Sequence, residues 1–150
     1  MAEDQRLSLT LMLIGVGRLV REEADRSLEA AGDGHSLRLM SALGHLAHEP
    51  GLSYSELGRR AGITAQSMQA TVGRLERAGA VSRTSPSGRG RTAVLRVTEH
   101  GHRMLDEMRR TLAAVEEPLL AGLSAEERTV LAKALSTVAA QLSPAGPGRR

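Results

Sequence analysis

The middle third of this 150-residue sequence contains two short helices separated by a glycine. Ser53 and Glu56 have the spacing of a capping box, in which a serine caps a helix and a glutamate three residues later binds back to its start. The helix that they open ends at Gly62. Thr64 caps a second helix, which has an apolar stripe at helical spacing and ends before Gly79. Two short helices joined by a tight turn predict a helix-turn-helix motif.

Two short strands are expected directly after this helix pair, at residues 81–83 and 93–97. The second has apolar side chains at every other position, which is the period of a half-buried strand. Between the strands, residues 85–91 are mainly turn formers and arginines, among them Arg89 and Arg91. We therefore expect a β-hairpin with a basic tip, the feature called a wing.

Longer helices are expected on both sides of this region. They cover residues 7–31, 37–48, 99–120 and 125–142, and the third is expected to bend or break near Pro118. The chain has no Trp or Phe and a single tyrosine, so its core must be aliphatic, which suits packed helices better than a β-sandwich. The expected fold class is therefore mainly α with a small β-hairpin wing, a winged helix-turn-helix between terminal helices.

The methionines fit this helical core. Five of them fall at helical core spacing: Met12, Met40, Met68, Met104 and Met108. Because a flexible thioether fills irregular gaps between helices, we expect these residues to pack inside the protein and to bind no ligand.

Positive charge is concentrated in the same middle third. Residues 53–97 contain eight arginines and two glutamates, which give a net charge of +6. The net charge of residues 1–52 is −3, and that of residues 98–150 is zero. A basic stripe of this kind is the electrostatic footprint of a surface that binds a polyanion such as double-stranded DNA.

The second short helix offers a polar face for reading DNA. Gln66 and Gln69 can each pair with adenine through two hydrogen bonds, and Ala70 is small enough to contact a thymine methyl. Arg74 and Arg77 lie further along the helix, where they suit phosphates better than bases. The hydroxyls of Ser67 and Thr64 complete this face.

Two further places could bind the DNA backbone or the minor groove. Arg89 and Arg91 of the wing suit a narrow minor groove, where negative potential is highest. Ser53 and Ser55 begin a helix, where free backbone N–H groups favour a phosphate. Tyr54, at the same corner, could serve either the phosphate or the packing. The candidate DNA-binding residues are Ser53, Ser55, Thr64, Gln66, Ser67, Gln69, Ala70, Arg74, Arg77, Arg89 and Arg91.

An ordered series of motifs resembles the MarR family of bacterial transcription regulators over nearly the whole chain. They are Pro50-Gly51-Leu52-Ser53, Glu56-Leu57, Ile63-Thr64, Leu75-Glu76-Arg77-Ala78-Gly79, Arg83, Gly90-Arg91 and Val97-Thr98-Glu99-His100-Gly101. The resemblance implies a homodimer built from the first and last helices, a palindromic operator, and in many relatives release by a small phenolic or anionic effector. By position, Gln66, Ser67, Gln69 and Arg74 match the family's recognition-helix contacts, and Arg91 matches its wing arginine. Arg89 occupies the place of a wing acid.

The resemblance divides the chain by role. We expect a single domain, residues 1–150, in which 1–35 and 102–142 form the dimerisation region and 36–101 the winged helix-turn-helix. The tail, 143–150, is expected to be disordered. The expected partners are double-stranded DNA, a second copy of the chain and a possible small-molecule effector. No cofactor and no metal is expected.

Composition bears on the compartment and on other functions. The chain has no cysteine and no apolar stretch of membrane-spanning length, so we expect a cytoplasmic protein without a membrane partner. The sequence has no phosphate-binding loop, no nucleophile elbow and no nucleophilic cysteine, so we do not expect an enzyme. Two alternatives stay open: a winged-helix module that binds proteins instead of DNA, and a regulator that binds a metal through His45, His48, His100 and His102.

Overall fold

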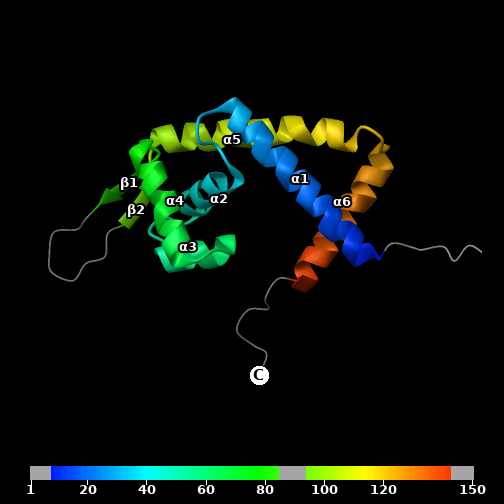
Figure 1. Ribbon diagram of the computed structural model, residues 1–150, viewed down its shortest axis with the longest axis horizontal. Helices are drawn as coiled ribbons and strands as arrows, with labels where there is room; N and C mark the ends of the chain where they lie inside the picture. The colour runs from blue at the N-terminus through cyan, green and yellow to red at the C-terminus, as the bar shows by residue number, and fades with distance from the viewer. Residues whose placement is uncertain (1–7, 85–93, 143–150) are drawn as a thin grey trace, which may run out of the picture. The chain divides into compact units, whose positions relative to one another are not determined.

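The computed structural model describes residues 8–84 and 94–142 and is mainly helical, with one two-stranded antiparallel sheet (Figure 1). The fold class expected from the sequence is confirmed. The elements are α1 (Leu9–Ala31), α2 (Leu37–His48), α3 (Tyr54–Ala61), α4 (Ala65–Arg77), β1 (Val81–Thr84), β2 (Val94–Val97), α5 (Glu99–Leu120) and α6 (Ala125–Leu142). The chain forms two compact units, residues 1–115 and 116–150, and the boundary falls within α5.

Helices α2, α3, α4 and α6 begin at the predicted caps. The Ser36 hydroxyl accepts a hydrogen bond from the Leu39 N–H at 3.3 Å, and the Asp25 carboxylate of α1 accepts one from the Leu37 N–H at 3.0 Å. The first turn of α2 is thus held by one cap of its own and one from α1. In α5, Pro118 does not end the helix, which continues to Leu120.

The first unit has one aliphatic core. Its fully buried large side chains come from five helices, and they are Leu28, Leu43, Leu46, Leu57, Met68, Val72, Leu75, Leu105 and Met108. The predicted stripe of the second short helix, Met68, Val72 and Leu75, is therefore confirmed. Thr71 is buried beside it, and its hydroxyl donates to the Ser67 carbonyl at 2.9 Å. Met12 was expected in a core but is 48% exposed in the single chain, so that expectation is wrong within one chain.

The β-hairpin joins this core to the start of α5. Val81 pairs with Val97 and Thr84 with Val94, and Val81 and Leu95 are buried. The Thr98 N–H donates to the Ala80 carbonyl at 3.0 Å, while its hydroxyl donates to the Gly79 carbonyl at 2.6 Å. These bonds fix where α5 starts relative to the sheet.

The second unit contains the end of α5 and all of α6. The predicted capping box is present: the Glu127 carboxylate accepts from the Ser124 N–H at 2.8 Å, and the Ser124 hydroxyl accepts from the Glu127 N–H at 3.3 Å. Arg128 pairs with Glu117 at 2.9 Å. No residue of α6 is buried. Within the described ranges, no helix has the length and apolarity to cross a membrane.

Candidate nucleic-acid interface

The turn between α3 and α4 is tight because Gly58 carries no side chain. A Cβ on Gly58 would lie 2.7 Å from the Ile63 carbonyl oxygen, and the Ile63 N–H donates to the Gly58 carbonyl at 2.9 Å. Gly62 adopts the left-handed conformation (φ +68°) that ends α3. The Thr64 hydroxyl then caps α4 by accepting from the Ser67 N–H at 3.1 Å. The sequence therefore predicted this helix-turn-helix correctly.

The outer face of α4 presents two glutamine side chains that have no hydrogen-bond partner among the described residues. Gln66, Gln69 and Ala70 are exposed on the side opposite the core stripe. In the part of the chain that the structure describes, neither glutamine amide makes a hydrogen bond to another residue. Both amides are consequently available to base edges. Thr64 and Ser67 are more committed, since the Thr64 hydroxyl both caps α4 and donates to the Ser67 hydroxyl at 3.0 Å.

Arg74 and Arg77 lie near the end of α4, beside a pocket of about 280 Å³. The other residues lining it are Asp33, Gly34, Leu39, Leu75, Ala78 and Met104. The Arg74 Nη2 atom is 3.5 Å from where a Cβ on Gly34 would lie, so this side chain reaches the loop between α1 and α2. Both arginines are exposed, and Arg74 borders the pocket as well as the polar face of α4.

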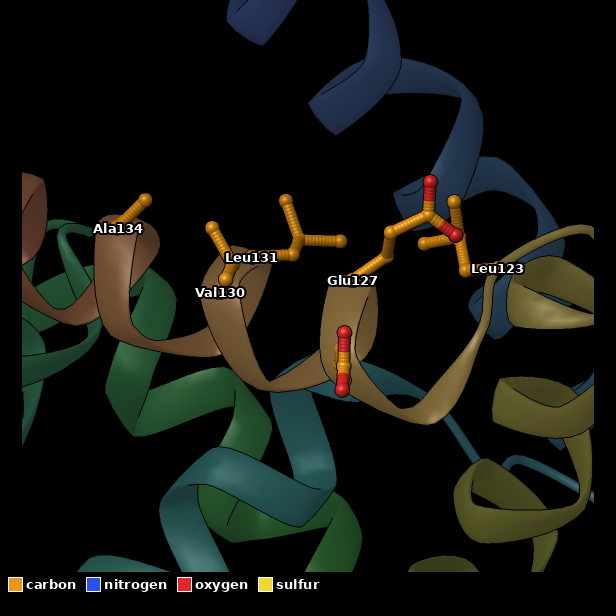
Figure 2. A pocket seen from close by; sticks show the side chains of 6 residues that line it. Leu123, Glu127, Val130, Leu131 and Ala134 are labelled. Atoms are coloured by element: carbon orange, nitrogen blue, oxygen red, sulfur yellow. The ribbon is translucent and has the colours of Figure 1, made fainter.

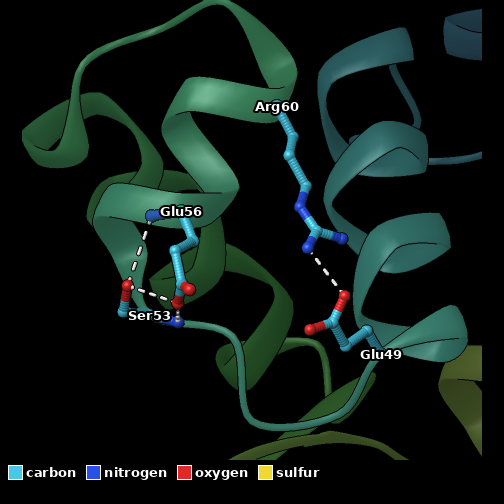
Figure 3. A network of polar contacts seen from close by, with 4 residues as sticks. All are labelled: Glu49, Ser53, Glu56 and Arg60. Carbon is cyan, nitrogen blue, oxygen red and sulfur yellow. Dashed lines mark hydrogen bonds and ion pairs between the residues drawn. The ribbon is translucent and has the colours of Figure 1, made fainter. Parts of the chain in front are cut away.

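The N-terminus of α3 is occupied by its own glutamate (Figure 3). The Glu56 carboxylate accepts from the Ser53 N–H at 2.9 Å and from the Ser53 hydroxyl at 2.8 Å. These two hydrogen bonds, helped by the charges of Arg59 and Arg60, hold the pKa of Glu56 below its ordinary value. Ser53 is therefore used inside the capping box, and a phosphate there would meet a carboxylate. Ser55 is exposed, and its role in DNA binding stays a prediction.

Tyr54 belongs to a contact that no pattern in the sequence predicts. Its ring packs against the edge of the core, and the Arg83 guanidinium of β1 lies over it at 5.7 Å from the ring centroid. Arg83 also donates to the Tyr54 hydroxyl and to the Glu76 carboxylate of α4, the latter at 3.0 Å. Packing is thus one part of the role of Tyr54. The only sign of this contact in the sequence was that Glu76 and Arg83 both belong to the motifs that resemble the MarR family.

The arginines of the middle third divide into paired and unpaired ones. Arg60 pairs with Glu49 at 2.6 Å (Figure 3), and Arg83 pairs with Glu76. Four others make no ion pair with the described residues: Arg59, Arg74, Arg77 and Arg96. Arg89 and Arg91 lie outside the described residues. The unpaired arginines contribute most of the positive potential available to a polyanion.

The histidines do not form a metal cluster in the described ranges, where no three His, Asp or Glu side chains come together in a way that could hold an ion. His100 and His102 are exposed in the first turn of α5, and His45 and His48 lie in the last turn of α2.

Comparison with known proteins decides the family. Residues 40–92 match the family model described as MarR family. The HTH-type transcriptional repressor Rv2887 of Mycobacterium tuberculosis is 31% identical over 128 residues, which are 85% of this chain and 89% of that protein. The chain belongs to the MarR family. It is a transcription regulator with a winged helix-turn-helix, and it is not an enzyme.

Solved structures of the same MarR-family relative share the fold. Rv2887 in complex with salicylic acid has a TM-score of 0.72 and 30% identity, covering 87% of this chain and 95% of that chain. Rv2887 in complex with DNA has a TM-score of 0.72 and 28% identity, covering 87% and 96%. The six helices and the two-stranded hairpin described above are thus the MarR winged-helix fold.

Proposed function

We propose that this MarR-family chain represses transcription by binding a palindromic operator as a homodimer, with α4 of each copy in a major groove. One observation carries the proposal: Gln66 and Gln69 are exposed on the face of α4 opposite the core and have no hydrogen-bond partner among residues 8–84 and 94–142. Unpaired arginines flank them, as a helix that reads bases between phosphates requires. The relative Rv2887 has been solved with DNA, which supports the same use of this fold.

The experiment is selection of bound fragments from a pool of genomic DNA by the purified full-length chain. A two-fold dimer should recover an inverted repeat whose half-sites lie about 10 base pairs apart. Gln66→Ala and Gln69→Ala should change which bases are preferred within each half-site. A pool that shows no enrichment, or an enriched site without symmetry, would refute the proposal.

A dimer is supported by the apolar side chains that one chain leaves exposed. In the described ranges, every large exposed apolar side chain belongs to α1, to the last turn of α5 or to α6. In α1, the buried residues are Ala24 and Leu28, whereas Val16 is 56% exposed and Leu19 57%. Exposed apolar surface of this extent marks a protein interface.

The start of α6 shows the same feature. A groove of about 480 Å³ runs along it, and Figure 2 shows Val130, Leu131 and Ala134 on one side of the helix beside Leu123 and Glu127. Val130 is 66% exposed. We infer that a second copy of the chain covers α1 and α6.

Sedimentation velocity tests the dimer with a matched pair of variants. Val130→Glu places a charge on the apolar side of α6 and should yield monomers. Ala70→Glu adds the same charge on α4 and should keep the dimer while abolishing DNA binding. A monomeric wild-type chain, or a Val130→Glu variant that stays dimeric, would contradict the proposed interface.

We further propose that the pocket beside Arg74 and Arg77 binds a small aromatic acid that releases the DNA. Leu39, Leu75 and Met104 supply apolar walls, and two arginines against the single acid Asp33 give the lining a positive balance. Such a site suits a carboxylate on an apolar body. The relative Rv2887 has been solved with salicylic acid.

Salicylate is the probe for this second proposal. Salicylate should weaken operator binding by the wild-type chain. Calorimetry should show that salicylate binds the Arg74→Gln variant less tightly than it binds the wild-type chain. Arg96→Gln removes another unpaired arginine outside the pocket and should leave salicylate binding unchanged. Equal salicylate binding by wild type and Arg74→Gln would exclude this pocket.

A further inference from the structure

Arg83 joins the hairpin to both helices of the helix-turn-helix. Its guanidinium donates from Nε to Glu76 Oε1 at 3.0 Å and from Nη2 to Glu76 Oε2 at 3.3 Å. The same Nη2 donates to the Tyr54 hydroxyl, and the guanidinium lies over the Tyr54 ring. One side chain of β1 therefore contacts both α3 and α4. Glu76, Arg83 and Tyr54 are called the clamp below.

Apart from the clamp, β1 is held against the core by Val81. Val81 is buried, but Ser82, Arg83 and Thr84 are exposed. The partner strand β2 also buries one residue, Leu95, and in addition the Leu95 carbonyl accepts from the Gly51 N–H at 3.1 Å. The clamp is thus the polar attachment of β1 to α3 and α4.

The clamp engages three of the five N–H donors of the Arg83 guanidinium, those of Nε and Nη2. Three of the donor contacts of Arg83 go to Glu76 and Tyr54, and the hydrogen bond to Glu76 raises the pKa of the arginine. The positive charge of Arg83 is balanced by Glu76, whereas Arg74, Arg77 and Arg96 carry unbalanced charges. A planar guanidinium that binds a carboxylate in a bidentate way also fixes an orientation, which a lysine would not do.

We propose that Arg83 is a positioning residue for DNA binding: the clamp sets the direction in which the hairpin leaves α4, so that wing and recognition helix meet the DNA together. This inference rests on the proposed DNA-binding function. It gives Glu76 an unusual role, because an acidic residue beside a DNA-binding surface then increases affinity for DNA.

Glu76→Gln tests the inference through the sign of its effect. Loss of a negative charge near DNA should by itself strengthen binding. Release of Arg83 from the clamp should instead weaken binding to the selected operator, by about threefold to tenfold given the strength of partly exposed ion pairs and cation–π contacts. Affinity is measured by fluorescence anisotropy of a labelled operator across a series of salt concentrations.

Glu49→Gln is the matched control, since it also removes an arginine-paired carboxylate from the winged region, where Glu49 binds Arg60. It should bind DNA as tightly as wild type or more tightly. Arg83→Gln should weaken binding while leaving the slope of log affinity against log salt unchanged. The double variant Glu76→Gln/Arg83→Gln should be no weaker than the worse single variant, because both break one contact.

A spectroscopic readout separates positioning from general loss of structure. Tyr54 is the chain's one tyrosine and the chain has no tryptophan, so tyrosine fluorescence reports on the clamp alone. Its emission should change in Glu76→Gln and Arg83→Gln but not in Glu49→Gln, while far-ultraviolet circular dichroism stays constant in all three. Tyr54→Phe keeps the ring and removes the acceptor, and should cost less affinity than Arg83→Gln.

The outcomes are distinct. A Glu76→Gln variant that binds the operator as tightly as wild type, or more tightly, would refute the positioning role of the clamp. A salt slope that falls by about 0.9 in Arg83→Gln would refute it as well, because that fall is the signature of a lost phosphate contact. If the wild-type chain itself selects no DNA, the proposed function fails, and the role of the clamp in it fails as well.

Discussion

Gly101 lies where α5 presses most closely on the hairpin, so Gly101→Ala should destabilise the winged domain. A Cβ there would lie 2.0 Å from the Ala80 carbonyl oxygen and 2.7 Å from Val97 Cγ1. The carbonyl cannot simply move away, because it accepts the hydrogen bond from the Thr98 N–H at 3.0 Å. The start of α5 must shift instead.

The size of the effect follows from that geometry. A carbon normally approaches a carbonyl oxygen no closer than about 3.3 Å, so the contact requires a shift of about 1.3 Å. Overpacking of this kind costs about 1–3 kcal/mol, and loss of the hydrogen bond to Ala80 adds about 1 kcal/mol. The better helix propensity of alanine returns about 1 kcal/mol. We expect a net loss of about 1–3 kcal/mol in the free energy of unfolding, or about 3–10 °C in Tm.

Urea and thermal denaturation followed by circular dichroism measure this loss, at one fixed protein concentration because a dimer's stability depends on it. Gly44→Ala is the control, since a Cβ on Gly44 in the middle of α2 meets nothing within 4 Å. That variant should be more stable than wild type by up to about 1 kcal/mol. A Gly101→Ala variant as stable as wild type would refute the close-approach argument.

Three further predictions concern helix caps and pH. The pKa values of Glu56, Glu117 and Glu127 are lowered in the folded chain, so their contribution to stability is complete above their ordinary value of 4.5 and is lost as the pH falls through the lowered values. The urea midpoint should therefore fall below pH 4.5, and it should fall less in Glu56→Gln; an equal fall would contradict this assignment. Thr64→Ala should cost about 1 kcal/mol of stability by removing the cap of α4, whereas Ser55→Ala, which removes no cap, should be neutral in the same denaturation experiment. Asp25→Ala should also cost about 1 kcal/mol, because the carboxylate caps α2 from α1, and protection of the α2 amides from hydrogen exchange should fall; unchanged protection would argue against the cap.

Local signals in the sequence predicted the elements well because their physics is local. A serine or threonine cap acts on an N–H three residues away, and a glycine such as Gly62 ends a helix through its own backbone angles. The burial of Met68, Val72 and Leu75 followed from helical periodicity alone. These features need no knowledge of what the helix packs against.

Contacts between distant residues could not be predicted in the same way. Tyr54 and Arg83 are 29 positions apart, and neither has a pattern that names the other. Arg74 was expected to face phosphates, and its reach toward Gly34 depends on where the loop after α1 lies relative to α4. Periodicity also placed Met12 on an apolar stripe. Periodicity alone cannot distinguish a side chain buried in the core of one chain from a side chain covered by a second chain.

We propose that α4 reads DNA through glutamines and holds it through arginines. The most direct measurement compares Gln66→Ala with Arg77→Ala on the selected operator and on a scrambled sequence, over a range of salt concentrations. Arg77→Ala should weaken binding to both DNAs alike and reduce the salt slope by about 0.9, whereas Gln66→Ala should weaken binding to the operator only and leave the slope unchanged. If both variants bind both DNAs as wild type does, α4 is not the reading helix.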